Sequence, residues 1–177
     1  MKIVELILDP TDEQSGIEAI SVVETPAIEE NFIALNKHEV LLKEVDKEKR
    51  ILMGAALVPN KQIFRRNEKT DEDYYIFFSE DTVRKASELY FQKSNHQNAT
   101  LEHSEKLKGT TIVESWIVEN SKTDKSALYG MDLPKGTWMV SMKIEDDALY
   151  EKAKTGEVKG FSIEGYFADK YEMSQQK

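Results

Sequence analysis

The sequence contains no cysteine, and this absence excludes several kinds of site at once. Without thiols the chain cannot form a disulfide framework, a cysteine-ligated zinc or iron–sulfur centre, or a cysteine nucleophile. Stability must therefore come from buried apolar surface, and 177 residues are enough to form a sizeable core. The lack of thiols also fits a reducing compartment.

Positive charge is in the minority, with 24 Lys and Arg against 33 Asp and Glu and a formal net charge of −9. A chain of this sign lacks the electrostatic footprint of proteins that bind DNA, RNA or an anionic membrane. No apolar run approaches the length of about 18 residues that a membrane-spanning helix needs. Residues 1–9 are apolar too briefly for a signal peptide, so we expect a cytoplasmic protein without nucleic-acid or membrane partners.

Common ligand-binding motifs are missing as well. The sequence has neither G-x-x-x-x-G-K-[S/T] nor G-x-G-x-x-G, the glycine-rich loops that cradle phosphate groups. The three histidines, His38, His96 and His103, form no H-E-x-x-H motif. The acidic pair Asp146 and Asp147 is better explained by helix capping than by calcium binding. We therefore expect no metal and no cofactor.

Apolar periodicity predicts a single α+β domain that consists mostly of strands, with two modest helices. Strands are expected at residues 3–8, 51–58, 74–78, 99–103, 111–119, 136–144 and 160–167. The continuous apolar run 51–58 predicts a strand buried on both faces, whereas the alternation in 136–144 predicts a half-buried one. Helices are expected from a capping Ser79 to about residue 93 and from Asp146 or Asp147 to residue 154, ending at Gly156. The polar stretches 60–73 and 120–126 are predicted to be loops.

One serine lies in an unusual setting. Ser162 follows Gly160 at the start of a predicted strand, and Gly165 comes three residues later, so a peptide could approach the hydroxyl closely. A serine hydroxyl needs a neighbouring base to become a good nucleophile, and histidine suits that task near neutral pH. His103 is the candidate base. By themselves these residues are better explained as a strand serine and a surface histidine, because a catalytic pair is defined by geometry and not by order in the sequence.

Four short blocks follow one another along the last two thirds of the chain: L-E-H at 101–103, V-E-S-W-I at 113–117, K-G-T-W-M-V at 135–140 and K-G-F-S-I-E-G at 159–165. Together they resemble the XkdF-like phage serine proteases, relatives of the prohead maturation proteases that share a fold with herpesvirus assemblin. Residues 19–28 also resemble a segment found ahead of such domains. The resemblance implies an α+β fold that is predominantly antiparallel β, with a barrel-like core flanked by helices.

The same resemblance implies that His103 is the general base and Ser162 the nucleophile. Assemblins use a second histidine after the serine as the third member of the triad, but no histidine follows Ser162 here. A third member would then be a carboxylate that orients the imidazole.

Glu114 is our first candidate for that carboxylate. It lies on the predicted strand that follows His103, and strict alternation would place it on the same face as Ile112 and Trp116, where a carboxylate needs a partner. Pairing of Glu114 with a lysine is an equally good explanation. The alternative candidates for the third member are Asp169 and Glu164.

The resemblance implies a phage prohead (capsid maturation) serine endopeptidase, which cleaves scaffold and capsid-protein segments inside the assembling procapsid in the host cytoplasm, and also itself. Its protease-like domain would span residues 51–177. Residues 1–50 would supply an N-terminal strand and a charged segment that can belong to the same domain. The alternative is a catalytically inactive scaffolding or structural component of the phage head. A homo-oligomer is possible in either case.

Overall fold

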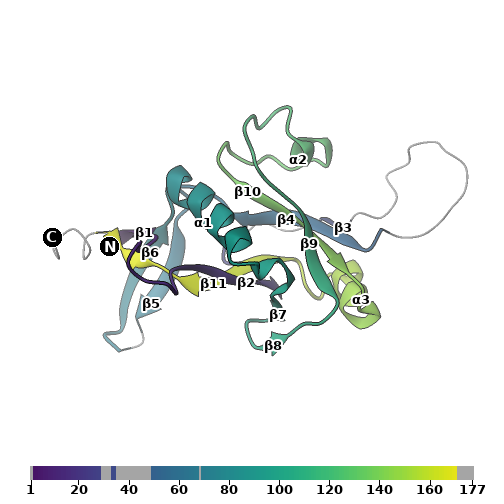
Figure 1. Cartoon of the computed structure of the whole chain (residues 1–177), viewed down its shortest axis with the longest axis horizontal. Helices are drawn as coiled ribbons and strands as arrows, with labels where there is room; N and C mark the ends of the chain where they lie inside the picture. The colour runs from purple at the N-terminus through teal and green to yellow at the C-terminus, as the bar shows by residue number, and fades with distance from the viewer. Residues whose placement is uncertain (1, 29–32, 35–48, 68, 171–177) are drawn as a thin grey trace, which may run out of the picture.

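The computed structural model of the chain describes residues 2–28, 33–34, 49–67 and 69–170 (Figure 1). Strand is the commonest secondary structure among these residues, as predicted. In chain order the elements are β1 (Lys2–Ile7), β2 (Gly16–Val23), β3 (Ile33–Ala34), β4 (Ile51–Leu57), β5 (Ile63–Asn67), β6 (Glu72–Phe77), α1 (Glu80–Gln92), η1 (Asn95–Gln97), β7 (Ala99–Leu101), β8 (Glu105–Lys106), β9 (Thr110–Ile117), α2 (Lys125–Leu128), β10 (Trp138–Ile144), α3 (Asp147–Thr155), β11 (Gly160–Tyr166) and β12 (Ala168–Asp169).

The strands form three four-stranded sheets with the orders β12-β1-β6-β5, β3-β4-β10-β9 and β11-β2-β7-β8. Most neighbours are antiparallel, but β1 pairs with β6 and β2 with β7 in parallel. The predominantly antiparallel α+β prediction is therefore confirmed. The barrel-like core is not, because closure requires the last strand of a sheet to pair with its first, and each sheet stays open within the described residues.

The apolar core is centred on β4 and β10, which pair with each other. All of β4 after its first residue is buried, as its unbroken apolar run predicted. The prediction of a half-buried strand for residues 136–144 was wrong, because β10 is buried at every position except Lys143. This strand lies between β4 and β9 and is contacted by both α1 and α3, so neither of its faces is left to solvent. The ring of Tyr90 packs edge-on against Trp138, with ring centroids 5.4 Å apart.

Both predicted helices are present. α1 begins after Ser79 as predicted, but the Ser79 hydroxyl makes no capping hydrogen bond to the helix backbone and instead contacts the Thr82 hydroxyl at 3.1 Å. The carboxylate of Asp146 accepts a hydrogen bond from the Leu149 amide at 2.7 Å and caps α3, which ends at Gly156 in a left-handed conformation. No helix of the described residues is long and apolar enough to cross a membrane.

Two predicted loops contain secondary structure, and the reason is tertiary. Residues 60–73 include β5, a polar strand that exists because it pairs along its length with β6. Residues 120–126 include the start of α2, capped by the carboxylate of Asp124. The charged segment expected within residues 1–50 covers residues 37–50 and lies outside the described residues except for its last two positions.

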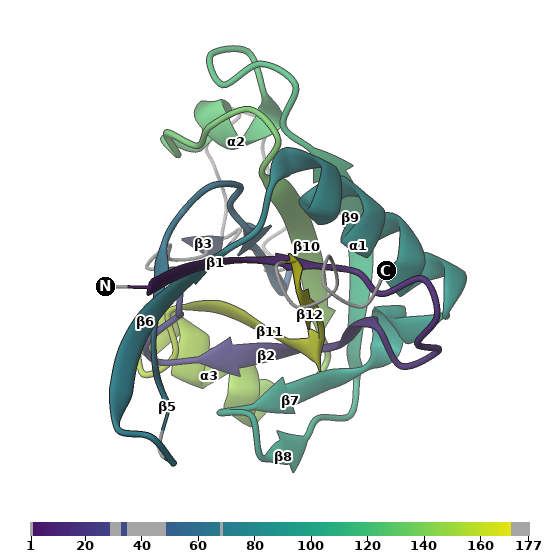
Figure 2. The same ribbon diagram turned by 90° about the vertical axis from the view of Figure 1, so that its left-hand side faces the viewer.

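The sheet β11-β2-β7-β8 is the part of the fold that matters for the site. Figure 2 shows β11, β2 and β7 running side by side. β2, from the N-terminal part of the chain, is the middle one of these three strands. It therefore lies between the strand that carries Ser162 and the strand that leads to His103.

Candidate catalytic site

Three neighbouring strands carry hydroxyl side chains in one row. Ser162 of β11 is paired with Ser21 of β2, which is paired with Thr100 of β7. Directly paired residues of neighbouring strands project to the same face of a sheet, and so do residues two apart on one strand. Glu164 accordingly shares this face with Ser162, and its carboxylate accepts a hydrogen bond from the Thr100 hydroxyl.

His103 joins this face from the turn that follows β7. The predicted strand 99–103 ends at Leu101, and Glu102 (φ 48°) and His103 (φ 57°) both take the left-handed conformation. This turn brings Nδ1 of His103 to 3.0 Å from Oε1 of Glu164. With Nδ1 held by a carboxylate, Nε2 is the ring nitrogen that would accept a proton, as in the catalytic triads of serine proteases.

The backbone of His103 is held as well. Its amide donates to the hydroxyl oxygen of Ser21 at 3.0 Å, and Ser21 is fully buried. Neither Ser21 nor Thr100 was among the site residues predicted from the sequence. Alternation along the predicted strand could have favoured Glu164, because residues two apart on a strand project to the same face of the sheet. Ser21 could be found only through the strand pairing.

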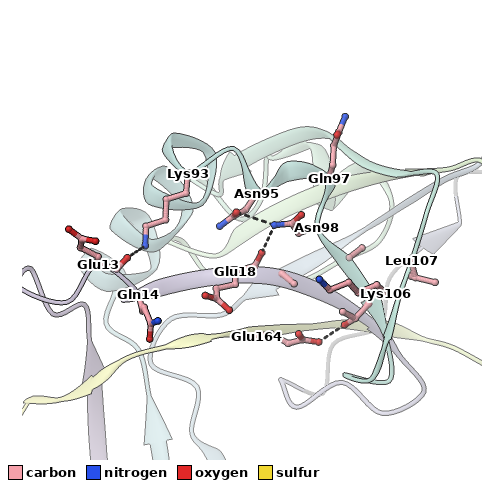
Figure 3. A pocket seen from close by; sticks show the side chains of 13 residues that line it. Glu13, Gln14, Glu18, Lys93, Asn95, Gln97, Asn98, Lys106, Leu107 and Glu164 are labelled. Atoms are coloured by element: carbon pink, nitrogen blue, oxygen red, sulfur yellow. Dashed lines mark hydrogen bonds between the residues drawn. The ribbon is translucent and has the colours of Figure 1, made fainter.

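Two hollows flank the row of hydroxyl groups. A pocket of about 300 Å³ borders Ser162 and is lined mostly by apolar residues, among them Ile63, Phe78 and Phe167. A second pocket, of about 490 Å³, borders Glu164 and is lined mostly by polar and charged residues, shown in Figure 3. Ser162 itself is 8% exposed. One pocket thus borders Ser162, and the other borders Glu164 and Thr100.

Glu114, the first candidate for the third member, lies in a different sheet and has other partners. It is on β9, where its carboxylate accepts hydrogen bonds from Nζ of Lys125 at 2.6 Å and from the Ser141 hydroxyl at 2.6 Å. The hydrogen bond from Lys125, with that from Ser141, holds the pKa of Glu114 below its ordinary value. This is the lysine pairing that the sequence left open as the alternative.

The expected placement of Glu114 on one face with Ile112 and Trp116 is correct for Trp116, which pairs with Met139 two residues from Ser141, but wrong for Ile112, because β9 carries a bulge. Glu114 pairs with Ser141, while Ile112 pairs with Met142. Since Ser141 and Met142 are neighbours on β10, they project to opposite faces, and so do Glu114 and Ile112. Strict alternation cannot anticipate the extra residue of a bulge.

Asp169, the remaining alternative, lies on β12, where its carboxylate is 3.8 Å from Nζ of Lys2. Of the three carboxylates considered, the described contacts thus join Glu164 to His103 and the other two to lysines. The structure brings together His103, Glu164 and the strand that carries Ser162.

Comparison with known protein families identifies one family to which the chain is related. The family described as "Putative phage serine protease XkdF" matches residues 37–172. The chain belongs to this family. No curated protein and no solved structure matches the chain.

The part of the chain that matches the XkdF family contains His103, Ser162, Glu164 and Glu114. The match does not include β1 or β2, and therefore leaves out Ser21, which contacts the backbone of His103. In this XkdF-family chain the middle strand of the candidate site thus comes from outside the matched region.

Proposed function

We propose that this member of the XkdF serine protease family is an endopeptidase in which Ser162 is the nucleophile, His103 the general base and Glu164 the residue that orients His103. The single observation that carries the proposal is the hydrogen bond between His103 Nδ1 and Glu164 Oε1 on the sheet face to which Ser162 belongs. A carboxylate on Nδ1 is the arrangement that makes Nε2 of a histidine a base for serine.

In the proposed reaction, Nε2 of His103 takes the hydroxyl proton of Ser162 as Oγ attacks the peptide carbonyl carbon. The tetrahedral intermediate collapses when the imidazolium returns the proton to the leaving amine, and the acyl group stays on Ser162 as an ester. Water, deprotonated by the same nitrogen, then hydrolyses the ester and frees the hydroxyl. Glu164 keeps the proton of the neutral ring on Nδ1 and stabilises the imidazolium in each half of the reaction.

The biological role that fits this family is maturation of the phage prohead. The proposed substrates are segments of the scaffold and major capsid proteins inside the assembling procapsid in the host cytoplasm, together with sites in the protease chain itself. A relation of the fold to herpesvirus assemblin is part of this proposal. The support for the role is membership of a phage serine protease family.

The proposal is tested with a fluorophosphonate probe and with co-expressed scaffold and capsid protein. We expect the wild-type chain to be labelled at Ser162 and to cleave its partners, and Ser162→Ala to do neither. Ser104→Ala is the control. Ser104 is an exposed serine next to His103 in the chain, and its hydroxyl donates a hydrogen bond to the Leu101 carbonyl. If wild type and Ser162→Ala behave alike in both assays, the proposal that the chain is a serine protease with Ser162 as nucleophile is wrong.

A catalytically inactive scaffolding component is the second candidate. The observation that favours it is the low exposure of Ser162, 8%, because a nucleophile must be reached by its substrate. The same experiment separates the two. A folded chain that is not labelled, does not shorten with time by intact mass, and leaves scaffold and capsid protein whole would be the structural component.

A further inference from the structure

The turn that carries His103 is unfavourable by itself. Glu102 and His103 both adopt positive φ, a region that residues with a Cβ rarely occupy, and they do so consecutively. Such a turn persists only where the surrounding structure holds it, and strained backbone of this kind is often found at functional sites. The question is therefore which contacts hold the turn.

Part of the support is local, because the Ser104 amide donates to the Leu101 carbonyl at 3.0 Å and the flanking strands β7 and β8 pair with each other. The other contacts come from β2 and the residue that follows it. The Glu102 amide donates to the Val22 carbonyl at 3.1 Å, and the Glu24 amide donates to Oε1 of Glu102 at 2.6 Å. The His103 amide donates to the hydroxyl of Ser21 at 3.0 Å. Of the last three described bonds, the bond between the His103 amide and the Ser21 hydroxyl involves the proposed base directly, and it depends on a side chain of β2.

Ser21 is suited to hold both ends of the turn. Its hydroxyl accepts from the His103 amide and donates to the Thr100 carbonyl at 3.4 Å, so one buried group connects the end of β7 to His103. Its backbone pairs with Ser162 on one side and Thr100 on the other. Ser21 therefore has a defined position relative to both the proposed nucleophile and the proposed base.

We propose that Ser21 is a positioning residue for His103, and that β2 is a functional part of the catalytic site although it lies outside the region that matches the family. The proposal rests on the proposed function of Ser162 and His103. Without the Ser21 hydroxyl, the His103 amide loses its acceptor in a partly buried setting, which favours relaxation of the turn. The imidazole then leaves Glu164, and Nε2 is no longer held where a base is needed.

The test compares Ser21→Ala, Ser21→Thr and Ser141→Ala. Ser21→Thr retains a hydroxyl and suits a strand. Ser141→Ala is the matched control, because Ser141 is also a fully buried strand serine with a hydrogen-bonded hydroxyl, but its partner is Glu114. Two readouts are measured: the rate of fluorophosphonate acylation at Ser162, and the tautomer of the His103 ring by ¹⁵N–¹H correlation spectra. His103→Gln identifies the signals of His103 among those of the three histidines.

We expect Ser21→Ala to slow acylation about 10-fold to 100-fold, because misplacement of a catalytic group by about 1 Å has effects of this size. The ring should also lose its uniform Nδ1-protonated form. Ser21→Thr and Ser141→Ala should match wild type in both readouts. If Ser21→Ala does not fold, Ser21→Cys, which keeps the size of the side chain and only a weak acceptor, is measured in its place with the same expectation.

Two results would overturn the proposal. One is a Ser21 variant without the hydroxyl that keeps both the wild-type acylation rate and the wild-type tautomer. The other is a probe adduct on Ser21 instead of Ser162, which would make Ser21 a nucleophile. If no form of the chain is acylated, the proposed function fails. The tautomer readout still decides the positioning role in that case, because it does not depend on turnover.

Discussion

The carboxylate of Glu164 lies 3.0 Å from Nδ1 of His103, although 61 positions separate the two residues in the chain. This contact spans the sheet, because Glu164 is on β11, His103 follows β7, and β2 lies between those strands. It also places a carboxylate on Nδ1 of the histidine, where the catalytic triad of a serine protease has one. In the sequence, Glu164 follows the proposed nucleophile Ser162 by two residues.

Replacement of Glu164 should therefore impair catalysis, while replacement of Glu114 should not. Glu164→Gln keeps the size of the side chain but removes the charge that orients His103, and we expect acylation of Ser162 to slow by about 10²-fold to 10⁴-fold. Glu114→Gln, the matched control, should stay within about 3-fold of wild type because its partners are Lys125 and Ser141. Stopped-flow or gel-based labelling measures both. If Glu114→Gln slowed acylation more than Glu164→Gln did, Glu114 and not Glu164 would be the third member of the triad.

The hydroxyl of Thr100 should contribute a smaller effect through Glu164. Thr100→Val preserves the shape of the side chain and removes the hydrogen bond to the carboxylate. Loss of one such bond corresponds to roughly 1 kcal/mol, or about 5-fold in rate. Thr137→Val is the control, since Thr137 is also buried but its hydroxyl donates to the Pro134 carbonyl. A Thr100→Val chain as fast as Thr137→Val would show that this bond does not support catalysis.

Stability in acid should depend on Glu114. Because hydrogen bonds from Lys125 and Ser141 lower the pKa of Glu114 in the folded chain, its ionised form stabilises the fold above its ordinary pKa of 4.5. This contribution is lost as the pH falls from that value through the lower folded-state pKa. Urea unfolding between about pH 6 and pH 3 should show a steeper loss of stability for wild type than for Glu114→Gln. Parallel curves for the two chains would contradict the expected linkage.

Even a methyl group at position 165 should destabilise the fold. A Cβ at this position would lie 2.1 Å from the carbonyl oxygen of Gly16 and 2.8 Å from Cα of Ile17, both backbone atoms of the β2 region. Gly165→Ala should therefore push β11 away from β2 and lower the free energy of unfolding by about 3 kcal/mol, the upper end for overpacking. Thermal or urea unfolding measures the loss.

Gly130→Ala is the control for this substitution. A Cβ at Gly130 meets no described atom within 4 Å, so the substitution adds only the left-handed backbone strain of about 1 kcal/mol, at φ 78°. Equal losses for the two variants would mean that the close approach of β11 and β2 does not restrict Gly165. A larger loss at Gly165, with slower acylation at Ser162, is the expected result.

One feature of the site could be predicted from neighbouring residues alone, because alternation along β11 places Glu164 on the face of Ser162. The glycines around Ser162 indicated a strand open to a substrate, whereas Ser162 is only 8% exposed. Alternation failed for Glu114, since the bulge in β9 reverses the direction of its side chain relative to Ile112. A bulge depends on the partner strand, and the sequence of one strand does not reveal it.

The sequence by itself determined the strand-rich α+β class, the two main helices, the serine and histidine candidates and the family, because these depend on local periodicity and on short motifs. Only the tertiary structure decided which carboxylate meets His103, and it alone brought Ser21 into the site. Both outcomes depend on the pairing of β2 with β11 and β7, and on a left-handed turn that is held by contacts from β2. The residues in those contacts are far apart in the chain, so no local pattern carries the information.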